Sequence, residues 1–318
     1  MNAMLDYSER TASLLTHIPL PVKNAFMEYL ARIWAPFRSG HTGFPESRLP
    51  FWDQFLPLLD RKFGGHPKPE GNPGGFLAQI RWAQFCFFVC IRIQDDFYDH
   101  QLENRSFVVL GNDFLLEVES FLGDYFPRNN HIHAIYPQLL RQTSHNIYRT
   151  VTLQEQYDPS PRDLLECYAG VGAIFHLGPS VLCMRYGKQE YAAPLRDLYS
   201  HLVVVCQILD DLTDISEDLR QGKVNFAAAV LLSSYSDGER SRDDALENIG
   251  RNIIRCGVGS VFEEVYQNLS AAAAIAADLD LTEIHEYVGR YRAGVRLLEA
   301  QHHKARVDTI FRPTAPPE

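Results

Sequence analysis

The chain of 318 residues contains six cysteines but no CxxC pair, and no basic segment followed by an apolar core at its N-terminus. It also has no uncharged apolar run of the roughly 18 residues that a membrane span needs. Its longest apolar runs are interrupted by Arg92 and Asp210. These absences argue against redox- or metal-active cysteines, a secretory leader and an integral membrane segment. They predict a cytoplasmic protein with buried free thiols.

The sequence further lacks the alternating pattern of β-strands and any repeat at a fixed period. Basic residues number 30 against 40 acidic ones, which gives a formal net charge of -10. This balance argues against a nucleic-acid partner and fits a protein that recruits cations. We therefore expect an all-α chain, folded as one domain over residues 1–311 and followed by a disordered, proline-rich tail at 312–318.

Apolar periodicity and glycine or proline breakers predict the helices. Residues 76–99 are apolar nearly all round, which predicts a buried helix after a loop at 64–75. A central helix is predicted at 191–219, with Pro194 in its first turn. Residues 162–177 form a helix with a break near Gly170 and Gly172, closed by Gly178-Pro179. Other helices are expected at 22–33, 51–62, 110–121, 132–156, 225–233, 245–255, 261–277 and 282–307.

Aspartates at four-residue steps mark two of these helices. Asp210, Asp214 and Asp218 share one face of the central helix, and Asp95 and Asp99 share a face at the end of the 76–99 helix. Like charges at this spacing repel by a few tenths of a kcal/mol per pair, so cations are expected opposite them. Two such faces, each next to a long apolar segment, predict metal ligands.

Asp96 and Asp211 follow the first aspartate of each face directly. A helix turns by about 100° per residue, so their side chains point away from the metal ligands. We expect them to support the ligands or to cap a helix end.

Magnesium prefers oxygen ligands in octahedral geometry, typically one or two carboxylates with substrate phosphates and water. Facing aspartates on two helices could hold a small metal cluster and leave open positions for a diphosphate. Asp95, Asp99 and Asp210 are therefore the predicted catalytic residues, because the metal would stabilise the charge that develops on the leaving group. Arg220 and Lys223 lie just beyond the aspartates and are predicted to bind the diphosphate.

An apolar wall is predicted around this site. It would comprise Phe87, Phe88 and Ile91, one or two turns before Asp95, with Phe175 near the glycine break. Aromatic faces can stabilise a carbocation by cation–π attraction, although plain core packing explains each residue equally well.

Four segments resemble motifs of the trans-isoprenyl diphosphate synthase and class I terpene synthase superfamily. Residues 95–99, DDFYD, resemble its first aspartate-rich motif, and residues 207–214, QILDDLTD, its second, including the preceding Gln207 that we assign to the cavity. Gly222-Lys223 resembles the pair after the second motif, and residues 110–116 resemble the Gly-Asp-x-Leu-Leu helix. The resemblance implies an isoprenoid-synthase-like helical bundle around an apolar cavity.

The same resemblance implies the chemistry. It suggests Mg²⁺, about three ions once diphosphate is bound, and ionisation of an allylic prenyl diphosphate to a carbocation. A prenyl diphosphate is thus the expected substrate, with a homodimer as an open alternative to a monomer. Terpene synthases often carry an Arg-Tyr pair near the C-terminus, which Arg290 and Tyr291 resemble, and the resemblance implies that these two residues also bind the diphosphate.

Departures from the motifs indicate the branch. Chain-elongating members carry basic segments that bind isopentenyl diphosphate. Here the loop before the first motif offers only Lys68, and residues 102–106 after it contain one arginine, Arg105. The expected lysine–threonine pair is replaced by residues 168–172, YAGVG. Each lost charge-assisted hydrogen bond removes roughly 1.5–3 kcal/mol, so a terpene synthase, a lyase that acts on one diphosphate, is predicted.

Three alternatives remain. A prenyltransferase that couples the allylic diphosphate to isopentenyl diphosphate or another acceptor keeps both aspartate motifs. A carboxylate-bridged di-iron bundle needs two Glu-x-x-His motifs, and the chain has one, Glu299–His302. A non-catalytic subunit of a heteromeric synthase would typically lose the aspartates that this chain retains.

Overall fold

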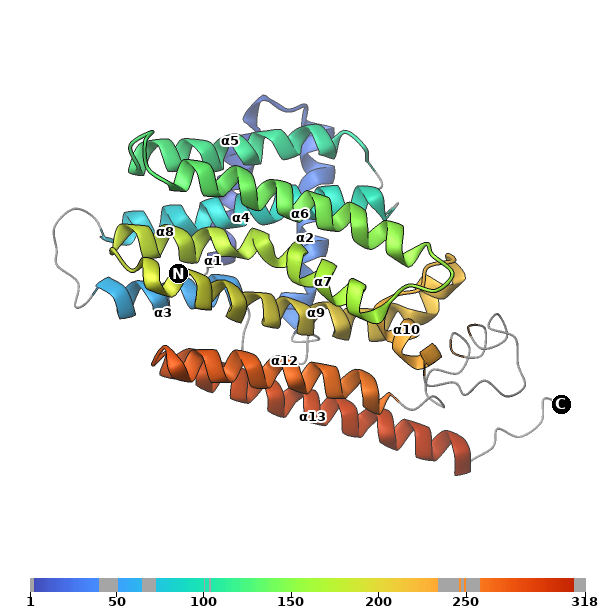
Figure 1. Cartoon of the computed structure of the whole chain (residues 1–318). Coiled ribbons are helices and arrows are strands. Elements are labelled where there is room, and N and C mark those ends of the chain that lie inside the picture. Colours follow the sequence, from blue (N-terminus) through green and yellow to red (C-terminus); the bar gives the residue numbers. More distant parts are fainter. Residues whose placement is uncertain are drawn as a thin grey trace. The chain divides into compact units, whose positions relative to one another are not determined.

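The computed structural model is helical throughout the residues that it describes, which are 3–39, 51–64, 73–99, 101–102, 104–233, 246, 249 and 258–311, and these contain no strand. The predicted all-α class is therefore confirmed. Figure 1 shows the helices, whose bounds are as follows. They are α1 (Ala3–Leu14), α2 (Leu20–Ser39), α3 (Phe51–Gly64), α4 (Pro73–Tyr98), α5 (Phe107–Tyr125), α6 (Ile132–Gln154), α7 (Pro161–Val171), α8 (Leu177–Arg185), α9 (Ala192–Arg220), α10 (Phe226–Ser233), α12 (Gly259–Asp278) and α13 (Thr282–Phe311), with short 3₁₀ turns at Leu15–His17, Gly172–His176 and Gln189–Tyr191.

The chain packs as two compact units. Unit 1 comprises Met1–Ser144 and Ile174–Ala193, and unit 2 comprises His145–Ala173 and Pro194–Glu318. Unit 1 contains α1 to α5, most of α6, and α8, while unit 2 contains the end of α6, α7, nearly all of α9, and the helices that follow. The single domain over residues 1–311 stays a prediction, and the predicted tail at 312–318 lies outside the described residues.

In unit 1, α4 is the buried helix that the sequence predicted. Ile80, Phe85 and Val89 are each at most 1% exposed, and α5 lies alongside α4 (Figure 1). The helix begins at Pro73, three residues before the predicted start, because proline is readily accommodated in the first helical turn. The rest of the predicted loop, residues 65–72, lies outside the described part of the chain.

A buried ion pair fixes three helices of unit 1 to one another. Asp53 of α3 is fully buried and accepts hydrogen bonds from Arg81 of α4, at 2.8 Å from Nε and 2.5 Å from Nη2, and from the hydroxyl of Tyr7 in α1 at 2.5 Å. A buried carboxylate is costly unless it is paired in this way. The contact therefore sets the register of α1 and α3 on α4.

The glycine break is present, but its end differs from the prediction. α7 ends at Val171, a 3₁₀ turn follows, and α8 then begins at Leu177 and continues through Gly178-Pro179 to Arg185. The expectation that Gly178-Pro179 closes a helix is thus wrong, since this proline lies in the first turn of α8, where the missing N–H costs nothing. In unit 1, Gln84 pairs with the freed backbone groups, donating to Ile174 O at 2.9 Å and accepting from Gly178 N at 3.0 Å.

In unit 2, α9 forms the central helix close to its predicted bounds, and Pro194 occupies its first turn as expected. Hydrogen bonds join α9 to α12, and α12 to α13. His201 of α9 pairs with Asn268 of α12 at 2.8 Å, and Tyr266 of α12 donates to Glu299 of α13 at 2.7 Å. α12 and α13 lie side by side (Figure 1). The helix predicted at 245–255 falls almost wholly outside the described residues.

Two stretches, Gly75–Tyr98 and Pro161–Arg185, are long and apolar enough to cross a membrane by length and composition. In the structure 67% and 72% of their most apolar windows are buried within the protein. The second stretch is also interrupted by the 3₁₀ turn at Gly172–His176. Core helices show the same burial, so this feature says little about a membrane.

Candidate functional site

The first aspartate face occupies the last turn of α4, in unit 1. The amide of Asp99 donates to the carbonyl of Asp95 at 2.9 Å, so the helical turn between them is intact and both side chains lie on one face. Both are half-buried, and the Asp95 side chain is 34% exposed. Two carboxylates at this spacing are accessible at the end of an otherwise buried helix.

Arg92 is a feature of this face that the sequence analysis did not assign. Its Nη1 lies 3.2 Å from Asp95 Oδ2, and its Nη2 lies 2.7 Å from Asp96 Oδ1. The signal was present in the sequence, because Arg92 precedes Asp95 by three residues and Asp96 by four, and such pairs meet on a helix. A cation therefore does lie beside this aspartate face, as the spacing of the carboxylates led us to expect.

Asp96 is a structural group at the end of α4. It is 3% exposed, and its carbonyl accepts from the amides of Gln101 and Leu102 at 2.8 and 3.0 Å, which ends the helix. On α2, burial and then the negative charge of Asp96 raise the pKa of Tyr29, which keeps that hydroxyl protonated. The helix-end role agrees with the structure.

The predicted wall residues of unit 1 separate into two environments. Phe88 and Phe175 come together at 6.2 Å between ring centroids, and both contact Trp52, at 5.6 and 5.9 Å. Phe87 is fully buried and packs edge-on against Tyr136 of α6 instead, at 5.5 Å. Ile91 is also buried, at 4% exposure. The geometry therefore groups Phe88 with Phe175 and gives Phe87 the contacts of a core residue.

The second aspartate face lies on α9, in unit 2. Asp210 and Asp214 are exposed and Asp218 is half-buried, and because α9 is continuous through them all three share one face. Gln207, one turn earlier, is half-buried. Thr213 donates from Oγ1 to Leu209 O at 2.9 Å, so its hydroxyl is used within the helix.

The side chain of Asp211 points away from this face and is buried in the interior of unit 2. Its Oδ2 accepts from the hydroxyl of Tyr168 at 2.7 Å and from the amide of Phe226 at 2.8 Å. Burial raises the pKa of the Asp211 carboxyl well above its usual range, and these two hydrogen bonds oppose the shift. Asp211 thus supports the fold beside the predicted ligands.

Asn225 connects this interior network to the aspartate face. Its Nδ2 donates to the carbonyl of Asp211 at 2.9 Å and to Asp218 Oδ2 at 2.7 Å. Its Oδ1 accepts from the amide of Ala228 at 3.0 Å and so caps α10. Sequence analysis passed over both Asn225 and Tyr168, since the first lies seven residues past Asp218 and the second on another helix.

The predicted diphosphate-binding residues occupy three different settings. Arg220, at the end of α9, is exposed and paired with Glu217. Lys223 is half-buried in the turn that follows, which Gly222 makes possible with a φ of +78°, and its amide donates to Asp218 O at 2.8 Å. On α13, Arg290 is exposed, whereas Tyr291 is 3% exposed and its hydroxyl lies 3.6 Å from Cys206 Sγ, one turn before Asp210.

The donor set suits a hard cation. Within the described residues, no three His, Cys, Asp or Glu side chains converge closely enough to hold a metal ion by themselves. Each aspartate face offers carboxylates only, and magnesium typically takes one or two of these together with phosphate oxygens and water. The residues therefore fit Mg²⁺ bound jointly with a diphosphate. That the two faces meet across an apolar cavity stays a prediction.

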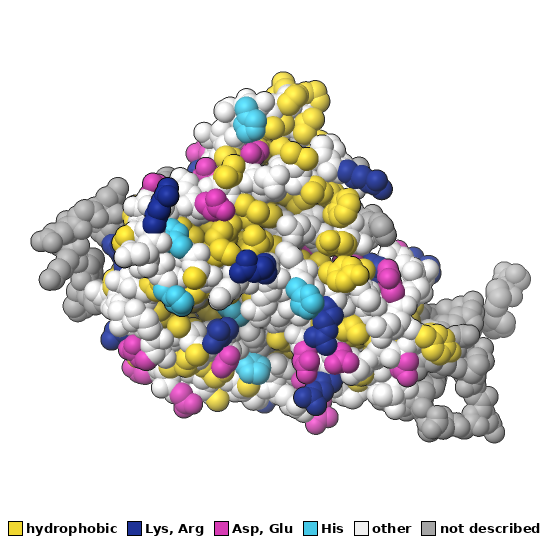
Figure 2. Space-filling model, turned by 45° about the horizontal axis from the view of Figure 1, so that its top comes forward, with side chains coloured by type: hydrophobic (Ala, Val, Ile, Leu, Met, Phe, Trp, Pro, Cys, Tyr) yellow, Lys and Arg dark blue, Asp and Glu magenta, His cyan; other side chains and the backbone are white. Residues whose placement is uncertain are grey.

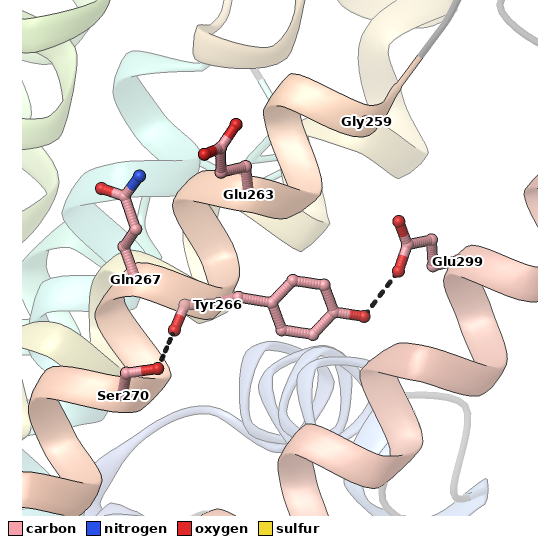
Figure 3. A pocket seen from close by; sticks show the side chains of 6 residues that line it. All are labelled: Gly259, Glu263, Tyr266, Gln267, Ser270 and Glu299. Carbon is pink, nitrogen blue, oxygen red and sulfur yellow. Dashed lines mark hydrogen bonds between the residues drawn. The ribbon is translucent and has the colours of Figure 1, made fainter.

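A separate open pocket of about 540 Å³ lies along α12 and α13 and contains none of these residues (Figure 3). Glu299 in its wall accepts from Tyr266, while His302 packs edge-on against the ring of Phe262, 6.0 Å away. The two ends of the Glu-x-x-His motif thus have different neighbours. Besides Glu299 and Tyr266, the pocket is lined by Gly259, Glu263, Gln267 and Ser270.

No family model and no curated protein matches the sequence. Solved structures do match over nearly the whole chain. A decaprenyl diphosphate synthase from Rhodobacter capsulatus gives a TM-score of 0.67 at 13% identity, covering 92% of this chain and 96% of its own. A geranylgeranyl pyrophosphate synthetase from the archaeon Geoglobus acetivorans gives 0.66 at 16% identity, covering 91% and 97%. The geranylgeranyl pyrophosphate synthase from Corynebacterium glutamicum gives 0.63 at 16% identity, covering 94% and 91%. The chain therefore has the isoprenoid-synthase fold that these synthases share, which is the fold that the resemblance of its motifs implied.

Proposed function

We propose that this protein is a Mg²⁺-dependent prenyltransferase, which ionises an allylic prenyl diphosphate and joins the prenyl group to an acceptor. One observation carries the proposal: on an isoprenoid-synthase fold, α4 and α9 each present carboxylates four residues apart from a helix that is largely buried. Carboxylates at this spacing repel one another, and a divalent cation bound to each set would offset that repulsion.

Transfer takes precedence over the cyclisation that the sequence predicted first. The structures that share the fold are named as synthases that build prenyl diphosphates. A terpene synthase remains the second candidate, because specific cations for a second diphosphate are scarce. Residues 168–172, YAGVG, stand where the lysine–threonine pair is expected, and Arg105 is exposed. This scarcity favours an acceptor other than isopentenyl diphosphate.

Each residue has a definite task in this proposal. Bound Mg²⁺ supplies a Lewis acid that stabilises the departing diphosphate. Asp95 and Asp99 on the α4 face would hold Mg²⁺, and so would Asp210, Asp214 and Asp218 on the α9 face. Arg220 and Lys223 donate hydrogen bonds to the anion. Phe88 and Phe175 form an apolar surface that excludes water and attracts a carbocation.

Purified protein is incubated with Mg²⁺ and prenyl diphosphates of increasing length, in the presence of isopentenyl diphosphate, of a panel of other prenyl acceptors, or of no acceptor. Diphosphate release and the mass of the products are measured. Transfer predicts release that depends on an acceptor, whereas a cyclase releases hydrocarbon or alcohol from the allylic diphosphate alone. Absence of Mg²⁺-dependent release from every substrate would contradict both.

Alanine variants connect the activity to the two faces. Asp95→Ala and Asp210→Ala are each expected to abolish Mg²⁺-dependent diphosphate release while the circular dichroism spectrum stays helical. Asp124→Ala on α5 and Asp197→Ala on α9 are matched controls, since both residues are exposed helical aspartates outside the motifs. Full activity in either motif variant would overturn the assignment.

The other classes find less support. A di-iron site would require Glu299 and His302 to converge with a second such pair, and their side chains have separate partners. In Figure 2, Lys and Arg side chains are interspersed with Asp and Glu and form no continuous basic patch on the described part of the face shown, which is unlike a nucleic-acid surface.

A further inference from the structure

Asn225 has an unusual number of roles for a side chain in a turn. It is fully buried, and its amide makes three hydrogen bonds: two donated by Nδ2, to Asp211 O and Asp218 Oδ2, and one accepted by Oδ1, from Ala228 N. The cap alone would need only an acceptor, which serine, threonine or aspartate also provides. The donor to Asp218 is therefore not explained by helix capping.

The position of Asn225 is itself fixed from several sides. The next residue, Phe226, donates its amide to Asp211, which also accepts from Tyr168 of α7. The preceding residue, Val224, donates its amide at 2.7 Å to the carbonyl of Gln154 at the end of α6. Tyr168 is 1% exposed and Asp211 is 7% exposed, so water does not compete for these bonds.

We propose that Asn225 is a positioning residue for Asp218, and that the Asp211–Tyr168 pair holds Asn225 in place for this task. The inference rests on the proposed function, in which Asp218 is a metal ligand. An aspartate at the end of a helix can rotate about two bonds, and a hydrogen bond to one carboxylate oxygen restricts both. The metal then meets the carboxylate in one orientation. Partners of this kind typically change metal affinity by about 10–100-fold.

The adjacent aspartates of the second motif thus divide the work. Asp210 remains on the exposed face, while Asp211 is buried and braces the turn after α9. That turn returns Asn225 to the same helix, one to two turns beyond Asp211, where it reaches Asp218. Lys223 lies in the same turn, with its amide 2.8 Å from Asp218 O, so bracing the turn also limits where its side chain can reach.

Asn225→Ser separates capping from positioning. Serine keeps an acceptor for the Ala228 amide but cannot donate to both Asp211 and Asp218. The measurement is calorimetric titration of the protein with Mg²⁺ in the presence of inorganic diphosphate, with the melting temperature recorded in parallel. We expect Mg²⁺ affinity to fall by about tenfold or more while the protein remains folded.

Two further variants make the result specific. Ser160→Ala removes a cap at the start of α7, where Ser160 Oγ accepts from Asp163 N at 3.3 Å, far along the chain from the motif. It should lower the melting temperature without changing Mg²⁺ affinity. In an Asp218→Asn background, Asn225→Ser should have little additional effect on affinity, because its action passes through Asp218.

The outcomes distinguish this inference from the proposed function. If the wild-type protein binds Mg²⁺ with diphosphate and Asn225→Ser binds it equally well, Asn225 is only a cap and the inference is wrong. An equal loss in the Asp218→Asn background also contradicts it. If the wild-type protein shows neither Mg²⁺-dependent binding nor turnover, the proposed function itself fails. Should Asn225→Ser not fold, Tyr168→Phe, which removes one hydroxyl, is titrated in its place and must weaken Mg²⁺ binding for the inference to stand.

Discussion

Arg92 makes a quantitative prediction about the first aspartate face. Its guanidinium is a resident cation, 3.2 Å from Asp95 Oδ2, and both side chains are 34% exposed. If Asp95 binds Mg²⁺, the incoming ion must share the carboxylate with this cation. Replacing Arg92 by glutamine removes the charge and keeps much of the side-chain length. We therefore expect Arg92→Gln to bind Mg²⁺ more tightly than the wild-type protein.

The magnitude follows from Coulomb's law. A Mg²⁺ ion lies about 2.1 Å from the carboxylate oxygen that it binds. Because Asp95 Oδ2 is 3.2 Å from Arg92 Nη1, an ion bound to this oxygen would lie at most about 5.3 Å from Nη1. At that distance a double and a single charge repel by about 1.6 kcal/mol in the dielectric of water. Screening at physiological salt reduces this to about 0.8 kcal/mol. The expected gain is about fourfold in Mg²⁺ affinity, where 1.36 kcal/mol corresponds to a factor of ten.

The stability of the same variant should move in the opposite direction. Arg92 Nη2 is also 2.7 Å from the buried Asp96, whose carboxylate loses this partner in Arg92→Gln. Removing one member of a buried pair is destabilising. A protein that binds Mg²⁺ more tightly but melts earlier is a combination that general loosening of the fold does not produce.

Calorimetric titration with Mg²⁺ at two salt concentrations tests the reasoning. The gain should shrink as salt rises, because it is electrostatic. Arg92→Lys keeps the charge and should stay close to the wild-type protein, and Arg162→Gln controls for net charge, since Arg162 is exposed on α7 in unit 2. Weaker Mg²⁺ binding in Arg92→Gln would refute competition and indicate that Arg92 helps to hold the metal or the diphosphate.

Three further predictions concern the packing. Asp53→Asn should cost about 3–5 kcal/mol in urea unfolding, because it leaves Arg81 without its buried partner, whereas the exposed Asp124→Asn should cost little. Gly170→Ala would place a Cβ 2.3 Å from Asn146 Cγ and should lower the free energy of unfolding by about 1–3 kcal/mol. In Gly123→Ala the new Cβ meets nothing within 4 Å, so this variant should stabilise α5. Equal changes in unfolding free energy would contradict the packing. Burial raises the pKa of Cys90 and Cys183 to about 12 and the pKa of Cys206 to about 11. Burial also raises the pKa of Cys86 and Cys167. At pH 8 a thiol reagent should therefore label these five cysteines slowly in the native protein, and all six cysteines rapidly in denaturant.

The features that could be predicted from the sequence are those set by local pattern. The apolar run of α4 predicted a buried helix, and the four-residue spacing placed Asp95 with Asp99 and Asp210 with Asp214 on shared faces. The role of Gly178-Pro179 at the end of the break was predicted wrongly, because local pattern alone is ambiguous there. The same dipeptide can close one helix or begin another, and only the partner decides. Here the side-chain oxygen of Gln84, more than ninety residues earlier, accepts a hydrogen bond from the backbone amide of Gly178.

Contacts between residues that are distant in sequence could not be predicted from local pattern. The two pairs of adjacent aspartates, Asp95-Asp96 and Asp210-Asp211, show why. On a half-buried helix, adjacent side chains point about 100° apart, so when one aspartate of a doublet is accessible its neighbour is driven inward and must find donors. Local pattern therefore predicts that Asp96 and Asp211 need partners. For Asp96 one partner is local, since Arg92 lies one turn away on α4 and forms an ion pair with it. For Asp211 the donors are Tyr168, 43 residues earlier, and the amide of Phe226. The partner of Asp96 could have been named from the sequence. The partners of Asp211 could not, because they depend on the packing of α7 and α10 against α9, and no pattern within α9 predicts that packing.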